Sequence, residues 1–290
     1  MTIYLNGEFM PIEEAKVSVL DRGFIFGDGV YELVPVYSRV PFRLDEHMAR
    51  LERSLAEVKI RNPYSREQWR EIIFRLIDQQ PFDDQGVYFQ VTRGVAKRDH
   101  AFPKYVEPTV FMMSNPLVNP PAEQVERGGA AVSAQDNRWL RCDIKSISLV
   151  GNVLLRQLSS EAGAAETILF RDGKLTEASA SNVFIVRRGV IQSPPKSSLI
   201  LAGITYDVVA ELAAANSLPL EFKEITEMEV RTADEIWVTS SSREVFAIVS
   251  LDGAKIGDGR PGPVFRRMHQ LYQEFKQKVM RAGKREAVSV

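Results

Sequence analysis

Hydrophobic and polar positions alternate in short runs from the start of the chain to Arg43, and glycines separate these runs. This alternation predicts short strands that end in glycine turns. The apolar spacing then changes to that of helices, one over about 46–58 with Asp45 as its N-cap and another over about 66–79. Their buried faces are expected to comprise Leu51, Leu55 and Val58 in the first helix and Trp69, Ile72, Ile73 and Leu76 in the second.

A long polar segment separates two further apolar runs. Gly86–Arg93 and Thr109–Met113 have the composition of strands, and Gly94–Glu107 lies between them. A loop of this length inside a compact domain is often functional.

The second half of the chain follows a proline-rich stretch, Asn115–Gln124, which is the best candidate for a linker. Beyond it we expect two hairpins, a helix, a short buried strand and an amphipathic terminal helix, over 167–175, 182–191, 204–215, 235–239 and 263–279. Strands and helices mix without a regular strand–helix–strand alternation. The pattern therefore predicts an α+β fold of two domains, residues 1–118 and 125–290, joined by a linker at 119–124.

Composition narrows the possible functions. The 290 residues carry a formal net charge of -1, so no strong field attracts nucleic acid or an anionic membrane. No apolar run reaches the length of a membrane span, and the first residues lack the pattern of a signal peptide. Cys142 is the only cysteine, which excludes an intrachain disulfide and fits a cytoplasmic location. Three histidines without paired spacing argue against a structural zinc site, and no metal is expected.

Two residues could carry covalent and acid–base chemistry. Lys145 lies in a strand-like stretch between Ile144 and Ile147, where its amine could enter a cleft and form an imine. Glu177 lies among small residues that would let a flat ligand approach, and a carboxylate on a pyridine nitrogen keeps that nitrogen protonated. Taken alone, each residue is more ordinarily a solvent-exposed side chain.

Several other positions could bind anions. Leu201, Gly203, Ile204 and Thr205 open a helix, whose first backbone N–H groups are free donors. Ser240 and Ser241 offer hydroxyl donors at a strand end, and Arg50 offers a fixed positive charge. The ordinary alternatives are a helix cap, a polar turn and a surface arginine.

The long loop contains Arg98 and His100, which together could hold a carboxylate. Tyr31 follows two closely spaced glycines and could donate a hydrogen bond to a ligand. A polar loop tip and a core tyrosine are the ordinary alternatives. Nothing in the sequence activates Cys142, which is expected to be a small buried residue.

Four blocks in order along the chain resemble the class IV, or fold type IV, pyridoxal-phosphate aminotransferases. They are Phe24–Glu32, Asp143–Ser146 with Gly151–Val153, Thr176–Ser179 with Ser181–Phe184, and Leu199–Thr205. Within that family the chain is most similar to the D-amino-acid aminotransferases, because an Arg-x-His loop matches Arg98-Asp99-His100. Branched-chain L-aminotransferases and aminodeoxychorismate lyases lack that pair.

The resemblance implies a fold, a cofactor and a set of roles. Pyridoxal 5'-phosphate would bind between the two domains, with Lys145 as its Schiff-base lysine and acid–base group. Glu177 would partner the pyridine nitrogen. The phosphate would be held by Arg50, Leu201, Ile204, Thr205, Ser240 and Ser241. Tyr31, Arg98 and His100 would bind the substrate carboxylate, with the loop pair reaching across a homodimer.

The implied reaction is transamination between amino acids and 2-oxo acids. D-alanine or D-glutamate is the expected donor, and 2-oxoglutarate or pyruvate the acceptor. A branched-chain L-aminotransferase, an amine transaminase or a lyase on the same fold stays open. So does a non-catalytic binding or scaffold domain, against which the presence of Lys145 and Glu177 argues.

Overall fold

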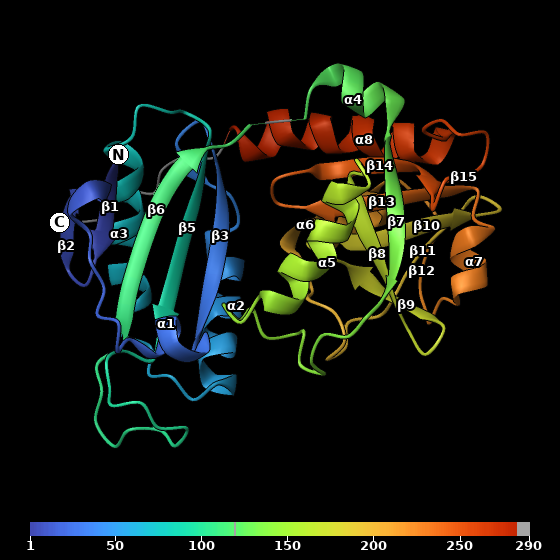
Figure 1. Cartoon of the computed structure of the whole chain (residues 1–290). Helices are drawn as coiled ribbons and strands as arrows, with labels where there is room; N and C mark the ends of the chain where they lie inside the picture. The colour runs from blue at the N-terminus through green and yellow to red at the C-terminus, as the bar shows by residue number, and fades with distance from the viewer. Residues whose placement is uncertain (119, 283–290) are drawn as a thin grey trace. The chain divides into compact units, whose positions relative to one another are not determined.

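The computed structural model describes residues 1–118 and 120–282, and it divides into two compact units (Figure 1). Within the described residues, unit 1 comprises Met1–Val118, Ile144–Leu149 and residues 279–282, and unit 2 comprises residues 120–143 and Val150–Lys278. Asn119 of the expected linker and residues 283–290 of the second expected domain lie outside the described residues. Both units contain strands and helices, so the α+β prediction is confirmed.

Unit 1 is built on an antiparallel sheet of six strands in the order β2-β1-β6-β5-β3-β4. Their bounds are β1 Thr2–Leu5, β2 Glu8–Pro11, β3 Gly29–Tyr37, β4 Val40–Pro41, β5 Gln85–Thr92 and β6 Thr109–Pro116. The helical elements are η1 Ile12–Glu14, α1 Arg22–Phe26, α2 Leu44–Glu57 and α3 Arg66–Asp78. The loop predicted between the two long strands therefore connects β5 to β6.

Helices α2 and α3 cover one face of this sheet (Figure 1). Val30, Val34 and Val36 alternate along β3 toward that face and are fully buried. The predicted inner residues of both helices join the same core, although Val58 and Ile72 are only partly buried there. Glu32 shares the alternation of the three valines and therefore also faces α2, which brings a carboxylate into the core.

The start of α2 differs from the prediction. The helix begins at Leu44, and its N-cap is Arg43 in a left-handed conformation (φ 51°) without a capping hydrogen bond from its side chain. Asp45 lies in the first turn, where its carboxylate favours the positive helix end and accepts a hydrogen bond from Arg70 (3.0 Å). Helix α3 begins as a capping box instead, with Ser65 and Gln68 satisfying each other's backbone N–H groups.

Unit 2 contains a nine-stranded sheet within the described residues, in the order β12-β11-β10-β13-β14-β7-β8-β9, with β15 paired to β14. The strands are β7 Gly129–Gln135, β8 Glu166–Arg171, β9 Lys174–Ala178, β10 Asn182–Arg187, β11 Val190–Ser193, β12 Leu220–Phe222, β13 Glu235–Ser240, β14 Glu244–Leu251 and β15 Ala254–Lys255. Helices are α4 Ala122–Arg127, α5 Val150–Glu161, α6 Ile204–Ala215, α7 Glu227–Arg231 and α8 Pro263–Phe275. A π-helical turn, Lys276–Met280, follows α8.

Both predicted hairpins are present in unit 2. Strands β8 and β9 join at Asp172-Gly173, and β10 and β11 join at Arg188-Gly189. All four turn residues have positive φ (50° to 79°), the geometry whose twist matches that of paired strands. The hairpins therefore fix the positions of Glu177 near the end of β9 and Asn182 at the start of β10.

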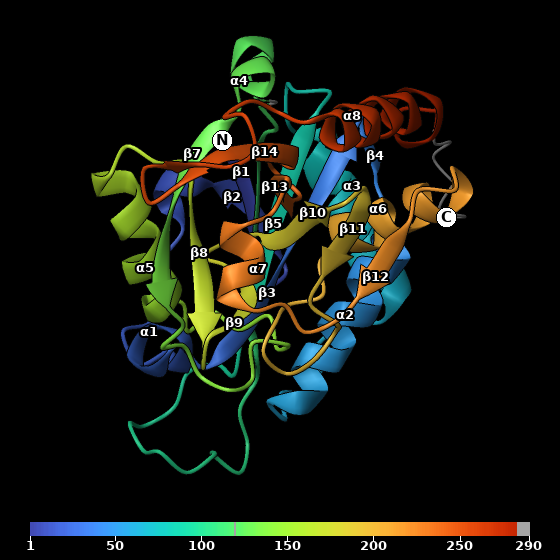
Figure 2. The same ribbon diagram turned by 90° about the vertical axis from the view of Figure 1, so that its right-hand side faces the viewer.

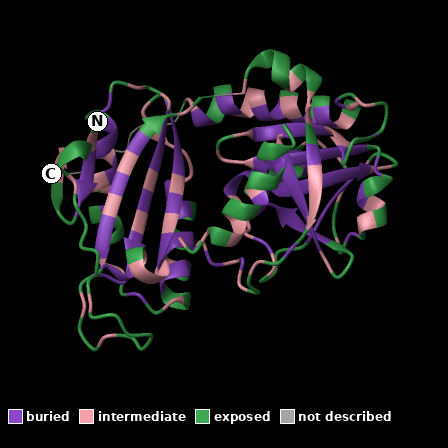
Figure 3. Ribbon diagram, viewed as in Figure 1, coloured by how far each residue is buried: buried purple, intermediate pink, exposed green. Residues whose placement is uncertain are grey.

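Helix α6 packs on β12 and β13, and α8 packs on β13 and β14, whereas α5 packs on β7 and β8 (Figure 2). The strands are mostly buried, and the outer face of α5 is exposed (Figure 3). None of the described helices is long and apolar enough to cross a membrane.

Candidate active site

Lys145 lies in the short segment Ile144–Leu149 that belongs to unit 1. The expected strand-like stretch is only an isolated antiparallel bridge between Ser146 and Val30 of β3. The backbone N–H of Tyr31 donates to the carbonyl of Lys145 (2.9 Å), and the Lys145 N–H donates weakly to Ser54 Oγ (3.4 Å). Its Nζ lies 4.3 Å from the centroid of the Tyr31 ring. The lysine amine is thus held over an aromatic face at the edge of β3.

Arg50 is anchored in the core of unit 1. Its Nε and Nη2 donate to the two oxygens of Glu32, each at 2.7 Å, and His47 Nδ1 lies 2.8 Å from the same carboxylate. Complete burial alone would raise the pKa of Glu32, but Arg50 and His47 hold it well below its usual range. Burial lowers the pKa of His47, and its Nε2 has no hydrogen-bond partner among the described residues. Arg50 is therefore a fixed cation.

The structure groups Arg98 and His100 on one aromatic ring. The Arg98 guanidinium carbon lies 5.4 Å from the ring centroid of Phe26, and the His100 and Phe26 centroids are 5.5 Å apart. Both side chains are exposed in the single chain. Within unit 1, the ring of Tyr31 contacts that of Tyr88 rather than His100. The loop pair and Tyr31 are therefore separate groups within one chain.

Glu177 is buried near the end of β9 in unit 2. Its Oε1 accepts a hydrogen bond from Arg138 Nη1 (2.6 Å), and its Oε2 accepts one from the Leu201 N–H (3.0 Å). Burial raises the pKa of this carboxyl to about 7, and the charge and hydrogen bond of Arg138 oppose that rise. Glu177 is thus a carboxylate whose negative charge is only partly compensated.

Arg138 is a site residue that the sequence did not reveal. Its Nε and Nη2 donate to Asp136, each at 3.0 Å, so only Nη1 is directed to Glu177. Asp136 also accepts the backbone N–H of Arg138 itself, a local turn typical of aspartate. That Asp-x-Arg turn is the one sequence signal that could have suggested it, and such turns are common on surfaces.

Asn182 connects Glu177 to the start of α6. Its side-chain amide donates to the Leu201 carbonyl (2.8 Å) and, more weakly, to Glu177 (3.3 Å), while its Oδ1 accepts the Gly203 N–H (3.2 Å). A side chain on Gly203 would place its Cβ 2.6 Å from that oxygen, so the Asn182 amide would have to move. Asn182 was part of the family motif but was not assigned a role.

The first turn of α6 offers free donors. Gly203 is the N-cap and provides no side-chain hydrogen bond, so the backbone N–H groups of the first helical residues, Ile204 and Thr205, remain available. Ser240 ends β13 directly after Thr239, which pairs with Asn182 of β10. Its hydroxyl accepts the Arg243 N–H (3.2 Å), and the neighbouring Ser241 is half-buried. Through Asn182, unit 2 thus brings the end of β13 close to the start of α6, where its predicted phosphate donors lie.

Each unit by itself contains groups that suit part of a phosphorylated pyridine aldehyde. Within unit 1, a lysine amine lies over an aromatic ring. Within unit 2, a buried carboxylate is hydrogen-bonded close to a helix start with free N–H groups. An amine can bind the aldehyde, a carboxylate can hold a protonated ring nitrogen, and the helix start can bind phosphate.

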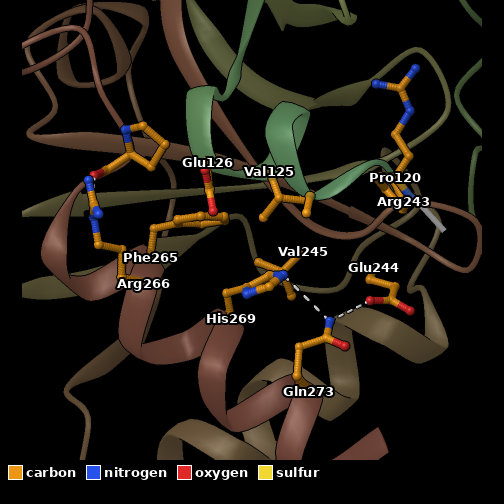
Figure 4. A pocket seen from close by; sticks show the side chains of 12 residues that line it. Pro120, Val125, Glu126, Arg243, Glu244, Val245, Phe265, Arg266, His269 and Gln273 are labelled. Carbon is orange, nitrogen blue, oxygen red and sulfur yellow. Dashed lines mark hydrogen bonds between the residues drawn. The ribbon is translucent and has the colours of Figure 1, made fainter.

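A different hollow on unit 2, of about 440 Å³, does not contain this chemistry (Figure 4). Its walls come from α4, α8 and β14, and none of the predicted site residues is among the twelve that line it. One acidic residue of its lining, Glu244, is already paired with Lys276 and with Gln273 (2.6 Å). The hollow is therefore not the candidate active site.

Comparison with known proteins gives concordant results. The model of the class IV amino-transferase family matches residues 29–251. The chain is 42% identical to a D-alanine aminotransferase of Bacillus licheniformis, over 94% of this chain and 96% of the relative. It is 39% identical to the protein of that name from Staphylococcus aureus (strain MW2), over 94% and 97%.

Solved structures share the fold. A branched-chain amino acid aminotransferase of the organism abbreviated T.th., solved with pyridoxamine 5'-phosphate, has a TM-score of 0.89 at 27% identity, covering 94% of this chain and 93% of that one. The branched-chain aminotransferase of Escherichia coli also has a TM-score of 0.89, at 25% identity and 99% coverage of both chains. The chain therefore belongs to the class IV aminotransferases of fold type IV, a family that depends on pyridoxal 5'-phosphate.

Proposed function

We propose that this aminotransferase transfers amino groups between D-amino acids and 2-oxo acids. The observation that carries the amino acid and 2-oxo acid substrate class is the pairing of Arg98 with His100 on the Phe26 ring at the tip of a long loop. A cation and a hydrogen-bond donor side by side suit the carboxylate that every such substrate has. The relatives named D-alanine aminotransferase support D-alanine or D-glutamate as donors, with pyruvate or 2-oxoglutarate as acceptors.

Residue roles follow from the two groups of side chains. When bound, pyridoxal phosphate supplies an electron sink for negative charge at the substrate α-carbon. Lys145 Nζ would hold the cofactor, and its amine would move the proton at the substrate α-carbon. Glu177 holds a proton at the ring nitrogen, because its charge is not fully satisfied by Arg138.

Other residues bind and orient. Backbone N–H groups of Ile204 and Thr205, the hydroxyls of Ser240 and Ser241, and the Arg50 guanidinium hold the phosphate. Leu201 fixes Glu177 through its N–H. Tyr31 joins the carboxylate-binding pair by donating its hydroxyl to the substrate.

A substrate screen tests the proposed function. Purified holoenzyme should convert D-alanine and D-glutamate with 2-oxoglutarate or pyruvate, and Lys145→Ala should abolish turnover with every substrate. Products are measured by chiral chromatography. Activity on L-leucine or L-valine without any on D-amino acids would instead assign the chain to the branched-chain group that its structural neighbours represent.

We further infer that the working unit is a homodimer. Each unit exposes a cluster of apolar side chains of the kind that protein interfaces bury. In unit 2 they follow a helical spacing along α5, namely Val150, Val153, Leu154 and Leu158. In unit 1 they precede and include α1, namely Val17, Val19, Leu20 and Phe24. A second copy of the chain would cover both clusters and bring the Arg98 loop to the partner's lysine.

Subunit mixing tests the shared site. Lys145→Ala and Arg98→Ala are each refolded alone and then together. In a two-fold dimer with exchanged loops, one pocket of a mixed dimer collects both defects and the other collects none, so roughly a quarter of all sites regain activity. If Arg98 serves its own chain, every pocket keeps one defect, and a mixture shown to contain mixed dimers recovers nothing.

A cytoplasmic location is also proposed. Cys142 is the only cysteine and is buried, and burial raises the pKa of its thiol to about 11. The chain therefore gains nothing from an oxidising compartment. Fractionation of cells that produce the protein measures its location.

A further inference from the structure

The two ends of the loop Gly94–Glu107 lie in close backbone contact. Gly94 has φ 103°, and a Cβ at this position would lie 1.9 Å from the carbonyl oxygen of Glu107. The first loop residues then run antiparallel to the segment before α1, through a bridge between Asp21 and Val95 and the hydrogen bond from Arg22 N–H to the Gly94 carbonyl (2.9 Å). The base of the loop is thus attached to α1.

A buried arginine, Arg22, attaches the middle of the loop as well, and Asp28 links it to a second buried arginine, Arg93. Asp28 accepts hydrogen bonds from Arg22 Nε (2.7 Å) and from Arg93 Nε (2.8 Å). Arg22 Nη1 donates a hydrogen bond to the carbonyl of Asp99 (2.5 Å), and Asp99 lies between Arg98 and His100 in the sequence. Because both guanidinium groups are almost completely buried, this contact fixes the backbone at the tip of the loop.

Phe26, the last residue of α1, provides the surface on which the side chains of the tip lie. Its ring contacts the guanidinium of Arg98 (5.4 Å), the ring of His100 (5.5 Å) and, from within the helix, the guanidinium of Arg22 (4.8 Å). Arg22 is also the residue that holds the backbone of the tip. One ring thus touches both proposed carboxylate-binding side chains and the residue that fixes their backbone.

We propose that Phe26 is a positioning residue for substrate binding. It holds Arg98 and His100 together before the substrate carboxylate arrives, so that these exposed side chains lose less freedom on binding. This proposal rests on the proposed function, because it assumes that Arg98 and His100 bind the carboxylate. It assigns to α1 a role in specificity that does not require contact with substrate or cofactor.

Phe26→Leu tests the proposal, because leucine keeps apolar volume but offers no aromatic face. Loss of one cation–ring and one ring–ring contact is expected to raise KM for D-alanine about tenfold while kcat stays within about twofold. The inhibition constant of D-lactate, a carboxylate without an amine, should rise by the same factor. Phe26→Tyr, which keeps the ring, should restore both values. Phe222→Leu, the same change on a half-exposed phenylalanine of unit 2, should alter neither.

A purely structural role would give a different pattern. Less folded holoenzyme would lower the apparent kcat and leave KM and the D-lactate constant unchanged, and that result would overturn the proposal. If Phe26→Leu does not fold, Phe26→Met serves as the second variant, since methionine fills the space with a flexible side chain.

A double-mutant cycle separates this inference from the proposed function. If Phe26 acts through the loop pair, Phe26→Leu should have no further effect on KM when Arg98 and His100 are already alanine. A tenfold effect that persists in that background contradicts the inference. If the Arg98→Ala, His100→Ala variant itself binds D-alanine normally, the proposed carboxylate role fails first, and Phe26 has nothing to position.

Discussion

Each unit contains a buried glutamate paired with an arginine, and the two pairs behave in opposite ways. In unit 1, Glu32 receives two hydrogen bonds from Arg50 and one from His47, and its pKa is well below the usual range. In unit 2, Glu177 receives one charged hydrogen bond from Arg138 and neutral ones from the Leu201 N–H and Asn182, and its pKa rises to about 7.

The difference lies in how each arginine divides its donors. Arg50 directs two donors to Glu32, whereas Arg138 directs Nε and Nη2 to Asp136 and only Nη1 to Glu177. Burial therefore outweighs the pairing in unit 2 but not in unit 1. A buried carboxylate with incomplete pairing gains from a further positive group, which a protonated pyridine nitrogen provides. The first pair holds Arg50 as a fixed cation, and the second leaves Glu177 open to a further positive group.

The largest expected effect is on turnover. Glu177→Gln should lower kcat by about 10²–10⁴-fold, because a neutral amide no longer favours the protonated ring nitrogen. Single-turnover kinetics on the cofactor-loaded variant measure it. A variant that keeps the wild-type rate would show that Glu177 has no role in the reaction and that the two glutamate–arginine pairs do not differ in this respect.

The next effect is on folding. Glu32→Gln should lower the free energy of unfolding by about 3–5 kcal/mol, because it leaves Arg50 buried without its counter-charge. Glu52→Gln is the matched control, since Glu52 pairs with Arg66 on the surface of α2 and its loss should cost less than about 1 kcal/mol. Urea unfolding measures both. Equal losses would show that burial does not distinguish the pairs.

The smallest effects should appear as opposite dependences on pH in the cofactor-free protein. Glu32 has a lowered pKa, so its contribution to stability is present above pH 4.5 and is lost as the pH falls. Glu177 has a raised pKa, so its ionisation between pH 4.5 and about 7 costs on the order of 1–3 kcal/mol, which Glu177→Gln should avoid. Stability curves of wild type and the two variants that run parallel would contradict both assignments.

Local patterns predicted most of the framework. Apolar periodicity gave the positions of α2, α3, α6 and both hairpins, because each depends on residues close together in the sequence. Short helices α1 and α7 were not predicted, since they are too brief to show a period. Helix α5 was also missed, because its exposed apolar face hides the usual amphipathic contrast.

Chemistry could be predicted only where it depends on motifs. Lys145, Glu177 and the Arg98 loop were identified by resemblance, and their roles remain proposals. Arg138, His47 and Phe26 were not identified, because their importance comes from what folding places beside them. A sequence can show that a residue is charged, but not how its donors are divided between two carboxylates.

Lys145 is the residue that we propose holds pyridoxal 5'-phosphate. Treating the loaded enzyme with borohydride and mapping its peptides by mass spectrometry tests this claim directly. We predict that the pyridoxyl group is found on the peptide that contains Lys145, and that the Lys145→Ala protein carries none. A pyridoxyl group on any other lysine of the wild-type protein would show that the assignment of Lys145 is wrong.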